Sequence, residues 1–239
     1  MVMRTPSPLL LAATLWAGAG CGGTVEPIEV GAGCPDQPVR GPTGYASEPA
    51  NQLIDDFETG DGKLPKIPPR DGYWVLGSDL LYDKLIALTA TSCVARGQYA
   101  GHFAGQGSTS WGNNWTAVFR ATASNGAVPY DARAYGGISF WAAFGSENGP
   151  VDFAVPVGVT TMDNAWNGGI CTSTCMDYYG TTVPLTHLWR RYEIRFADLA
   201  QAGWGAPQVP VMRKDQMVGF IIWPKQQFDI WIDDVRFEL

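Results

Sequence analysis

The stretch FDIWIDDVRFEL (residues 228–239) is a long run of apolar and aromatic residues, and it predicts a β-strand. It contains two adjacent aspartates, Asp233 and Asp234, and a similar stretch far upstream, QLIDDFETGDG (residues 52–62), contains a second pair. Strand interiors normally avoid aspartate, so each pair needs a partner such as a cation, a basic side chain or water. Because adjacent strand residues point to opposite faces, we expect one aspartate of each pair to face water.

The composition of the 239-residue chain favours strands over helices. Apolar residues make up 46% of it, which is enough for a packed core, while charged residues make up only 16%. Glycine and the large aromatic residues are abundant, and this suits many turns and half-buried strands. We therefore expect an all-β protein, with one large domain or two small ones.

About ten short segments rich in β-branched and aromatic residues are separated by Gly, Asn, Asp and Pro. They occupy residues 51–58, 72–77, 85–91, 98–107, 115–122, 136–144, 151–159, 189–196, 217–223 and 228–239. This spacing predicts a two-sheet β-sandwich or jelly roll that takes up residues 51–239. One helical turn is expected at residues 196–203, where Gly203 would end it.

The first twenty residues have the features of an export signal. Arg4 is followed by an apolar stretch at residues 8–20, which is too short to cross a membrane, and then by Cys21. The sequence GAGC before and at Cys21 resembles the lipobox of bacterial lipoproteins, although Gly18 stands where leucine is usual. We expect residues 1–20 to be a lipoprotein signal peptide and Cys21 to be lipidated. The alternative is ordinary secretion with a nearby cleavage site.

Residues 21–50 are rich in Gly, Pro and Glu without an apolar period, and they predict a tether between the anchor and the domain. Gly22 gives no inner-membrane retention signal of the familiar Asp kind, so we expect the cell envelope and favour the outer membrane. The formal net charge of −7 argues against nucleic acid or anionic lipid as a partner and favours a neutral one.

Five cysteines leave one unpaired in an exported protein, and lipidation of Cys21 would remove this anomaly. Of the three pairings that remain for the other four, we favour Cys171 with Cys175 and Cys34 with Cys93. The competing interpretation is a metal site on the C-x-x-x-C spacing. The two histidines of the chain lie far away in sequence, so we expect disulfides.

Two segments have the residue types of a sugar-binding site. Sugars present an apolar ring face edged by hydroxyls, so their sites combine aromatic platforms with polar side chains. The candidate residues come from WGNNW (residues 111–115) and MDNAWNGGICTSTCMDYYG (residues 162–180), and they are Trp111, Trp115, Trp166, Asp177, Tyr178 and Tyr179. The alternative is that these aromatic residues belong to the core, as we expect for Trp141, Trp223 and Trp231.

The aspartate pairs could hold a metal ion if the first and last strands are neighbours. Carboxylates and backbone carbonyls that converge on one point are the ligands that Ca²⁺ prefers. Glu58 follows the first pair and could join them. The alternative is that the acids pair with Arg236, Arg70 or water.

Four motifs occur in the order LIDDFETGDG, YGGISFWAAF, LWRRYEIRFADLAQAGWG and FDIWIDDVRF, and they span residues 53–237. Together they resemble the galactose-binding-domain-like jelly rolls, and most closely the carbohydrate-binding modules of the family-eleven type. The resemblance implies a jelly-roll fold and a polysaccharide or oligosaccharide ligand. It also implies a structural calcium ion held by Glu58 and Asp233.

Catalysis is not expected. A glycoside hydrolase needs two carboxylates in a cleft, and acids such as Asp152 and Glu193 leave that alternative open. His102 has the pattern of a strand histidine and His187 that of a surface loop, and the chain has no nucleophile elbow. We therefore expect a monomeric, non-catalytic, carbohydrate-binding lipoprotein. The main alternative is an envelope protein that uses the same fold for structure or for protein interaction.

Overall fold

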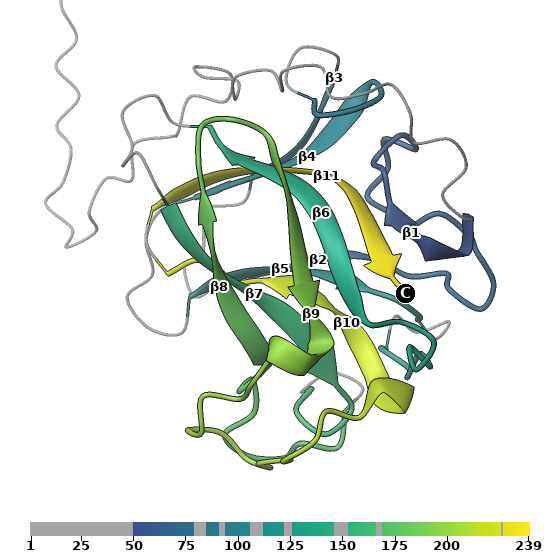
Figure 1. The fold of residues 1–239 in the computed structure, drawn as a ribbon, viewed down its shortest axis with the longest axis vertical. Helices are drawn as coiled ribbons and strands as arrows, with labels where there is room; N and C mark the ends of the chain where they lie inside the picture. The colour runs from purple at the N-terminus through teal and green to yellow at the C-terminus, as the bar shows by residue number, and fades with distance from the viewer. Residues whose placement is uncertain are drawn as a thin grey trace, which may run out of the picture.

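The computed structural model describes residues 50–78, 85–90, 94–105, 112–121, 126–145, 153–165, 169–225 and 227–239, and of residues 85–90 and 153 the backbone alone (Figure 1). The predicted signal peptide and nearly all of the predicted tether lie outside these residues. So do five individual residues for which the sequence made predictions, namely Cys21, Cys34, Cys93, Trp111 and Trp166.

The described chain forms two antiparallel sheets that pack face to face (Figure 1). One sheet has the order β3-β4-β11-β6-β9, with β1 also paired to β11, and the other has the order β2-β5-β10-β7-β8. The strands are β1 (Leu53–Asp55), β2 (Tyr73–Ser78), β3 (Leu85–Ala90), β4 (Tyr99–Gly105), β5 (Asn113–Val118), β6 (Gly137–Phe144), β7 (Phe153–Thr161), β8 (Tyr179–Leu185), β9 (Arg190–Arg195), β10 (Met217–Ile222) and β11 (Phe228–Glu238). The predicted all-β sandwich is confirmed.

Ten of these strands coincide with the ten predicted segments, and β8 is the strand that the sequence did not predict. Its sequence, YGTTVPL, contains Gly180 and Pro184, which are both rare in strand interiors. Proline is tolerated here because β8 lies at the edge of its sheet and pairs only with β7. The predicted helical turn is shorter than expected, since the 3₁₀ turn η2 covers only Phe196–Asp198.

The two ends of the domain lie side by side. Strand β1 pairs antiparallel with β11, and Leu53 lies opposite Arg236. Strand β11 also pairs with β4 and β6, so it lies inside the sheet and is buried along most of its length. The first and last strands are therefore neighbours, which is the condition for a site shared by the two aspartate pairs.

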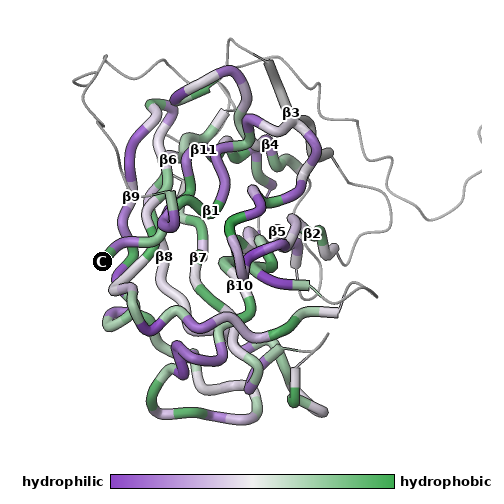
Figure 2. The backbone as a smooth tube through the Cα atoms, turned by 90° about the vertical axis from the view of Figure 1, so that its right-hand side faces the viewer, coloured by the Kyte–Doolittle hydropathy of each residue, from purple (hydrophilic) through white to green (hydrophobic). Residues whose placement is uncertain are grey.

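The core fills the space between the sheets. Hydrophobic residues, in green, recur along the central strands of both sheets (Figure 2). Trp115 lies at the centre, with its ring 4.3 Å from that of Trp74 and 5.6 Å from that of Phe103, measured between centroids. Among the described residues, no helix is long and apolar enough to span a membrane.

A second, smaller apolar cluster covers the outer face of the β1-containing sheet. Trp231 of β11 is buried there, Trp141 packs against the cluster, and the imidazole of His102 stacks on Trp231 at 3.9 Å. The Nε2 of His102 lies 2.5 Å from Oδ1 of Asp229 in the neighbouring strand. The predictions of structural roles for Trp141, Trp231 and His102 are confirmed.

The other histidine is held by the backbone. His187 is half-buried, and its Nδ1–H donates to the carbonyl oxygen of Phe144 at 3.0 Å. It therefore fixes the loop before β9 to the end of β6.

Candidate ligand-binding site

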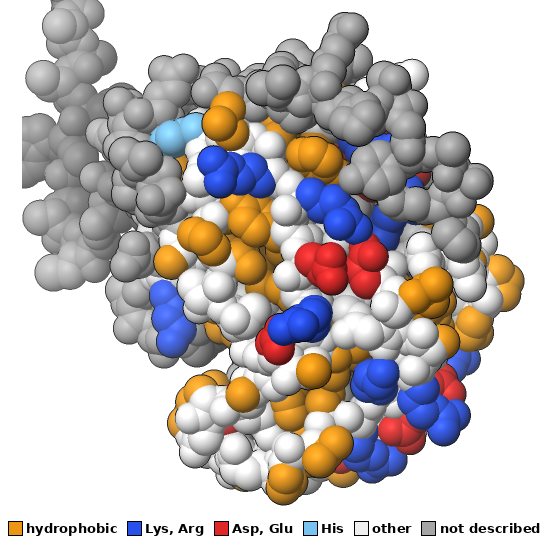
Figure 3. Space-filling model, in the orientation of Figure 1, with side chains coloured by type: hydrophobic (Ala, Val, Ile, Leu, Met, Phe, Trp, Pro, Cys, Tyr) orange, Lys and Arg blue, Asp and Glu red, His pale blue; other side chains and the backbone are white. Residues whose placement is uncertain are grey.

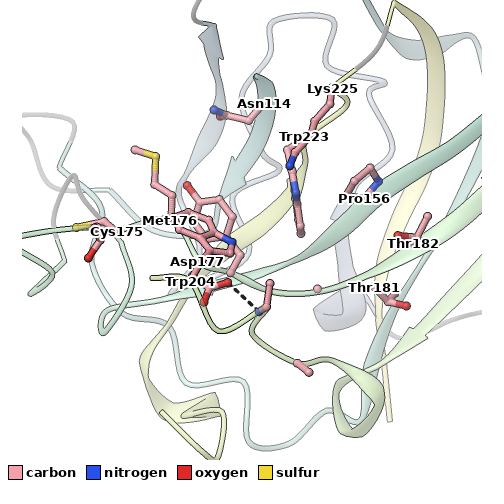
Figure 4. A pocket seen from close by; sticks show the side chains of 15 residues that line it. Asn114, Pro156, Cys175, Met176, Asp177, Thr181, Thr182, Trp204, Trp223 and Lys225 are labelled. Atoms are coloured by element: carbon pink, nitrogen blue, oxygen red, sulfur yellow. Dashed lines mark hydrogen bonds between the residues drawn. The ribbon is translucent and has the colours of Figure 1, made fainter. Parts of the chain in front are cut away.

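A pocket of about 850 Å³ lies on the outer face of the five-stranded sheet (Figure 4). Its floor comes from alternate residues of three strands, Asn114 of β5, Pro156 of β7 and Thr182 of β8. Since neighbouring strand residues point to opposite faces, residues on either side of these, such as Trp115 and Val157, lie in the core. Two loops, at residues 174–178 and 200–204, form the remaining walls.

Trp223 packs against the pocket floor. It follows β10, and its backbone N–H donates to the carbonyl oxygen of Pro156 at 3.1 Å. A Cβ atom on Gly180 would lie 2.5 Å from Cη2 of the indole, so only glycine at this position of β8 lets the indole approach the strand. The ring of Tyr178 meets that of Trp223 edge-on, with centroids 5.6 Å apart. Burial raises the pKa of Tyr178 to about 12, which keeps its hydroxyl protonated at neutral pH.

Trp204 is 60% exposed, at the tip of a loop that closes one side of the pocket. The buried carboxylate of Asp177 fixes this loop. Its Oδ1 accepts from the backbone N–H of Ala202 at 2.8 Å, and its Oδ2 accepts from those of Gly203 at 2.9 Å and Gly205 at 3.1 Å. A fourth donor, the side-chain amide of Gln208, lies 2.7 Å from Oδ2.

The four donors also set the charge of Asp177. Burial alone would raise the pKa of this carboxyl, but the hydrogen bonds outweigh burial and hold its pKa below the ordinary value. Asp177 is therefore ionised at neutral pH, and both of its carboxylate oxygens accept hydrogen bonds from the loop that carries Trp204.

Further contacts fix the same loop. Gln201 donates from Nε2 to the carbonyl oxygen of Asp177 at 2.8 Å and accepts from the N–H of Val209 at 2.8 Å. The hydroxyl of Tyr179 donates to the carbonyl oxygen of Val209 at 2.8 Å. In the adjoining loop, Cys171 and Cys175 form the favoured disulfide. Both walls are thus ordered before any ligand arrives, which lowers the entropic cost of binding.

The predicted ligand-binding residues that the structure describes lie in different places, some at the pocket and some in the core. Tyr178 lines the pocket. Asp177 touches it, but its two oxygens are engaged by the loop, so its predicted contact with a ligand is replaced by a positioning role. Tyr179 is 3% exposed and Trp115 is 0% exposed, and both point into the core. Their assignment to a binding surface is wrong, because strand alternation turns them away from the outer face.

Two pocket residues were missed by the sequence analysis. Trp223 ends the apolar run of β10, and this led to its assignment to the core, but it lies one residue beyond the inward-facing Ile222 and therefore on the outer face. Trp204 lies between two glycines in a loop. That setting is the sequence signal for an exposed tryptophan, because no strand or helix pattern accounts for the residue.

The aspartate pairs lie at the β1–β11 junction and away from the pocket. Asp233 and Asp234 are both buried, although one was expected to face water. The reason is a bulge, where the register of β11 shifts and Asp234 adopts a φ of 47°. Asp234 accepts from Arg96 and from Arg236 at 2.6 Å each. Arg236 is thus one of the partners that the alternative interpretation named.

The other acids of the junction have partners as well. Asp55 accepts from the indole N–H of Trp74 at 2.6 Å, and burial raises its pKa to about 7. Glu58 accepts from the backbone N–H groups of Gln98 at 2.7 Å and Tyr99 at 3.0 Å. Arg70 does not pair with these acids, since its guanidinium donates to the carbonyl oxygen of Asn51 at 2.6 Å.

One buried oxygen in this junction has no donor in the described part of the chain. Oδ2 of Asp233 accepts from the N–H of Arg96 at 2.7 Å, whereas its Oδ1 has no hydrogen-bond partner. Burial, followed by the nearby charge of Asp234, raises the pKa of Asp233 to about 8. Within the described ranges no group of three or more His, Cys, Asp or Glu side chains is spaced to bind a metal. A cation here would need carbonyl or water ligands in addition to Asp233 and Glu58.

No protein-family model matches the chain, and no curated protein matches it in sequence. Several solved structures resemble it. A family 11 carbohydrate-binding module from Clostridium thermocellum, in complex with a β-1,3-1,4-mixed-linked tetrasaccharide, is 12% identical with a TM-score of 0.49, over 78% of this chain and 94% of that one. A family 30 module of a cellulosomal cellulase from the same organism is 14% identical with a TM-score of 0.44, over 74% and 95%.

A third structure, the module TmCBM61 in complex with β-1,4-galactotriose, is 15% identical with a TM-score of 0.38, over 79% of this chain and 95% of that one. These are modules of the kind that the four sequence motifs resemble. At these identities the likeness concerns the fold and leaves the ligand to be argued from the pocket.

Proposed function

We propose that this chain is a non-catalytic polysaccharide-binding protein whose ligand lies in the pocket beside Trp204, Trp223 and Tyr178. The observation that carries the proposal is Trp204, which is 60% exposed on a loop held by four hydrogen bonds to one buried carboxylate. Exposure of a large apolar ring costs solvation free energy, and fixation of the loop that carries the ring lowers the cost of ordering it on a ligand. A sugar ring provides the matching apolar face.

The polar groups of the pocket suit hydroxyl recognition. The amide of Asn114 and the hydroxyl of Thr182 lie on the floor near the aromatic rings. Each of these groups both donates and accepts, as a sugar hydroxyl does. An open site that combines aromatic rings with such polar groups suits a segment of a polymer.

The pocket offers no pair of catalytic acids among the described residues that line it. Hydrolysis of a glycosidic bond requires two carboxyl groups about 5 to 9.5 Å apart. Asp177 is the only carboxylate in the described wall, and the loop occupies both of its oxygens. This arrangement supports a binding role.

Affinity electrophoresis through gels that contain single polysaccharides tests the proposal. We expect one class of polymer to retard the domain, and Trp204→Ala and Tyr178→Ala to weaken the retardation, with a dissociation constant raised at least tenfold. Leu188→Ala is the matched control, because Leu188 is 41% exposed and lies outside the pocket. Absence of retardation by every polymer, or equal retardation of Trp204→Ala and the parent, would overturn the proposal.

A second candidate, protein interaction, is favoured by one separate feature. A neighbouring pocket of about 740 Å³ is lined mainly by apolar residues, including Val211, which is 76% exposed. Contiguous exposed apolar surface is typical of protein contacts. Pull-down from envelope extract with the parent and with Val211→Asp tests this candidate. The expected result is a specific protein that the parent retains and Val211→Asp does not.

We propose that a calcium ion stabilises the β1–β11 junction, with Asp233 and Glu58 among its ligands. Support comes from the donor-free oxygen of Asp233 and from the position of both acids, which hold the same segment, residues 96–99. A bound Ca²⁺ would neutralise the buried negative charge.

We also propose that Cys21 carries a lipid that anchors the protein in the outer membrane, on the support of the sequence before it. Cys21→Ser should move the protein from the membrane fraction to the soluble fraction. Retention of this variant in the membrane fraction would contradict the anchor.

A further inference from the structure

The pocket contains one charged group that no described residue neutralises. Among the described residues that line it, only Asp177 and Lys225 carry a formal charge at neutral pH. The carboxylate of Asp177 accepts hydrogen bonds from four donors of the loop that carries Trp204. None of the ion pairs in the described part of the chain involves the exposed Lys225. The available charge of the pocket is therefore positive.

Lys225 lies close to an aromatic platform. It follows Trp223 by two residues, and the two side chains lie on the same wall of the pocket (Figure 4). The backbone between them is fixed, because the carbonyl oxygen of Pro224 accepts from the N–H of Asn113 at 3.4 Å. A sugar stacked on Trp223 would thus present one of its ring substituents to the ammonium group.

The overall negative charge of the chain does not oppose an anionic ligand at this place. The formal net charge of −7 belongs to the whole sequence. On the face shown in Figure 3, acidic side chains lie beside basic ones. Exposed charges more than about 8 to 10 Å apart are largely screened at physiological salt, so the nearest charge decides the preference of the pocket.

We propose that the pocket selects polysaccharides whose sugar rings carry an anionic group, either a carboxylate or a sulfate ester, next to the face that stacks on tryptophan. This inference rests on the proposed function and refines its ligand class. It replaces the neutral partner that the net charge favours. An exposed ion pair supplies only a modest gain, so we expect a preference of roughly two- to fivefold in dissociation constant per engaged anion.

Matched pairs of polymers test the proposal with the unlipidated chain. Polygalacturonate is compared with its methyl ester, carboxymethyl cellulose with hydroxyethyl cellulose, and sulfated carrageenan with neutral agarose. Titrations are made at about 20 mM and 300 mM salt, where the Debye lengths differ several-fold. Lys225→Met removes the charge, and Lys225→Arg retains it. Lys66→Met removes an equal charge from an exposed position outside the pocket.

The proposal requires that the anionic member of at least one pair binds more tightly than the neutral member. This preference should fall at high salt and be lost in Lys225→Met. It should persist in Lys225→Arg and in Lys66→Met. Equal binding of both members of every pair would overturn the anion preference and leave the proposed function intact. The same conclusion would follow if Lys66→Met reduced the preference as much as Lys225→Met does. Binding to none of these polymers or to neutral glucans, xylans and mannans would instead overturn the proposed function.

Discussion

Replacement of Asp177 by asparagine should loosen the Trp204 loop and weaken ligand binding while the fold remains. The new side chain would retain one acceptor oxygen. If that oxygen took the place of Oδ2, the amide would face the N–H of Ala202, and if it took the place of Oδ1, three donors would lose their acceptor. Asparagine is therefore unable to satisfy all four donors in either orientation.

The magnitude follows from the number of hydrogen bonds. At about 1 kcal/mol net for each, loss of one to three bonds lowers the free energy of unfolding by about 1 to 3 kcal/mol. Because the affected loop must then be ordered when the ligand binds, a cost of about 2 kcal/mol weakens affinity by roughly thirtyfold. The control is Asp131→Ala, since Asp131 is exposed and pairs only with Arg133 at the surface. It should leave both the free energy of unfolding and the affinity nearly unchanged.

Three measurements check this prediction: calorimetric titration, chemical denaturation and amide hydrogen exchange at Ala202, Gly203 and Gly205. The pH dependence has a definite sign. The folded-state pKa of Asp177 lies below its ordinary value, so its stabilisation is present above about pH 4 and is lost as pH falls through the folded-state pKa. The Asp177→Asn variant should not show this loss of stability as pH falls. Parent-like affinity together with unchanged exchange protection in Asp177→Asn would refute the positioning role.

Three further predictions concern the pocket floor, its second wall and the β1–β11 junction. Gly180→Ala should displace the indole of Trp223, because the new Cβ would lie 2.5 Å from Cη2, and should weaken sugar binding at least tenfold; unchanged titration curves would contradict the role of this platform. Replacement of both Cys171 and Cys175 by Ser should speed hydrogen exchange in the loop at residues 171–178 and weaken binding several-fold, whereas exchange in β11 should stay the same. Chelation of calcium should lower the melting temperature of the parent by roughly 5 to 10 °C if the ion is present at about 100 times its dissociation constant. Asp233→Asn should melt at one temperature with or without calcium, and a parent that is insensitive to chelation would disprove the metal site.

The sequence predicts the sandwich well because strand formation depends on local signals. Strands such as β6 and β10 combine apolar runs with clear turn residues at both ends. Strand β8 escapes prediction because Gly180 and Pro184 interrupt its strand-forming residues, and its stability comes from pairing with β7. An edge position that tolerates Pro184 is a property of the assembled sheet, which no local pattern records.

The pocket is less predictable because its definition depends on which face a residue occupies. Asp177, Tyr178 and Tyr179 are consecutive, yet the first holds a loop, the second lines the pocket and the third lies in the core. Composition located this segment, but the three roles follow from a register that only the assembled sheet fixes. Trp223 was likewise assigned to the core because it ends an apolar run, although alternation from the inward-facing Ile222 places it on the outer face.

The aspartate pairs and the pocket-lining aromatic residues lie on different sheets. The aspartates lie where β1 pairs with β11 in one sheet, and the pocket lies on the outer face of the other. Since the core of the sandwich separates them, substitutions far apart should have additive effects. A change at Asp234 should therefore lower stability through lost pairs with Arg96 and Arg236 while affinity at the pocket stays constant. The backbone pairing of β1 with β11 holds the ends of the domain together, and the outer face of the opposite sheet carries the pocket.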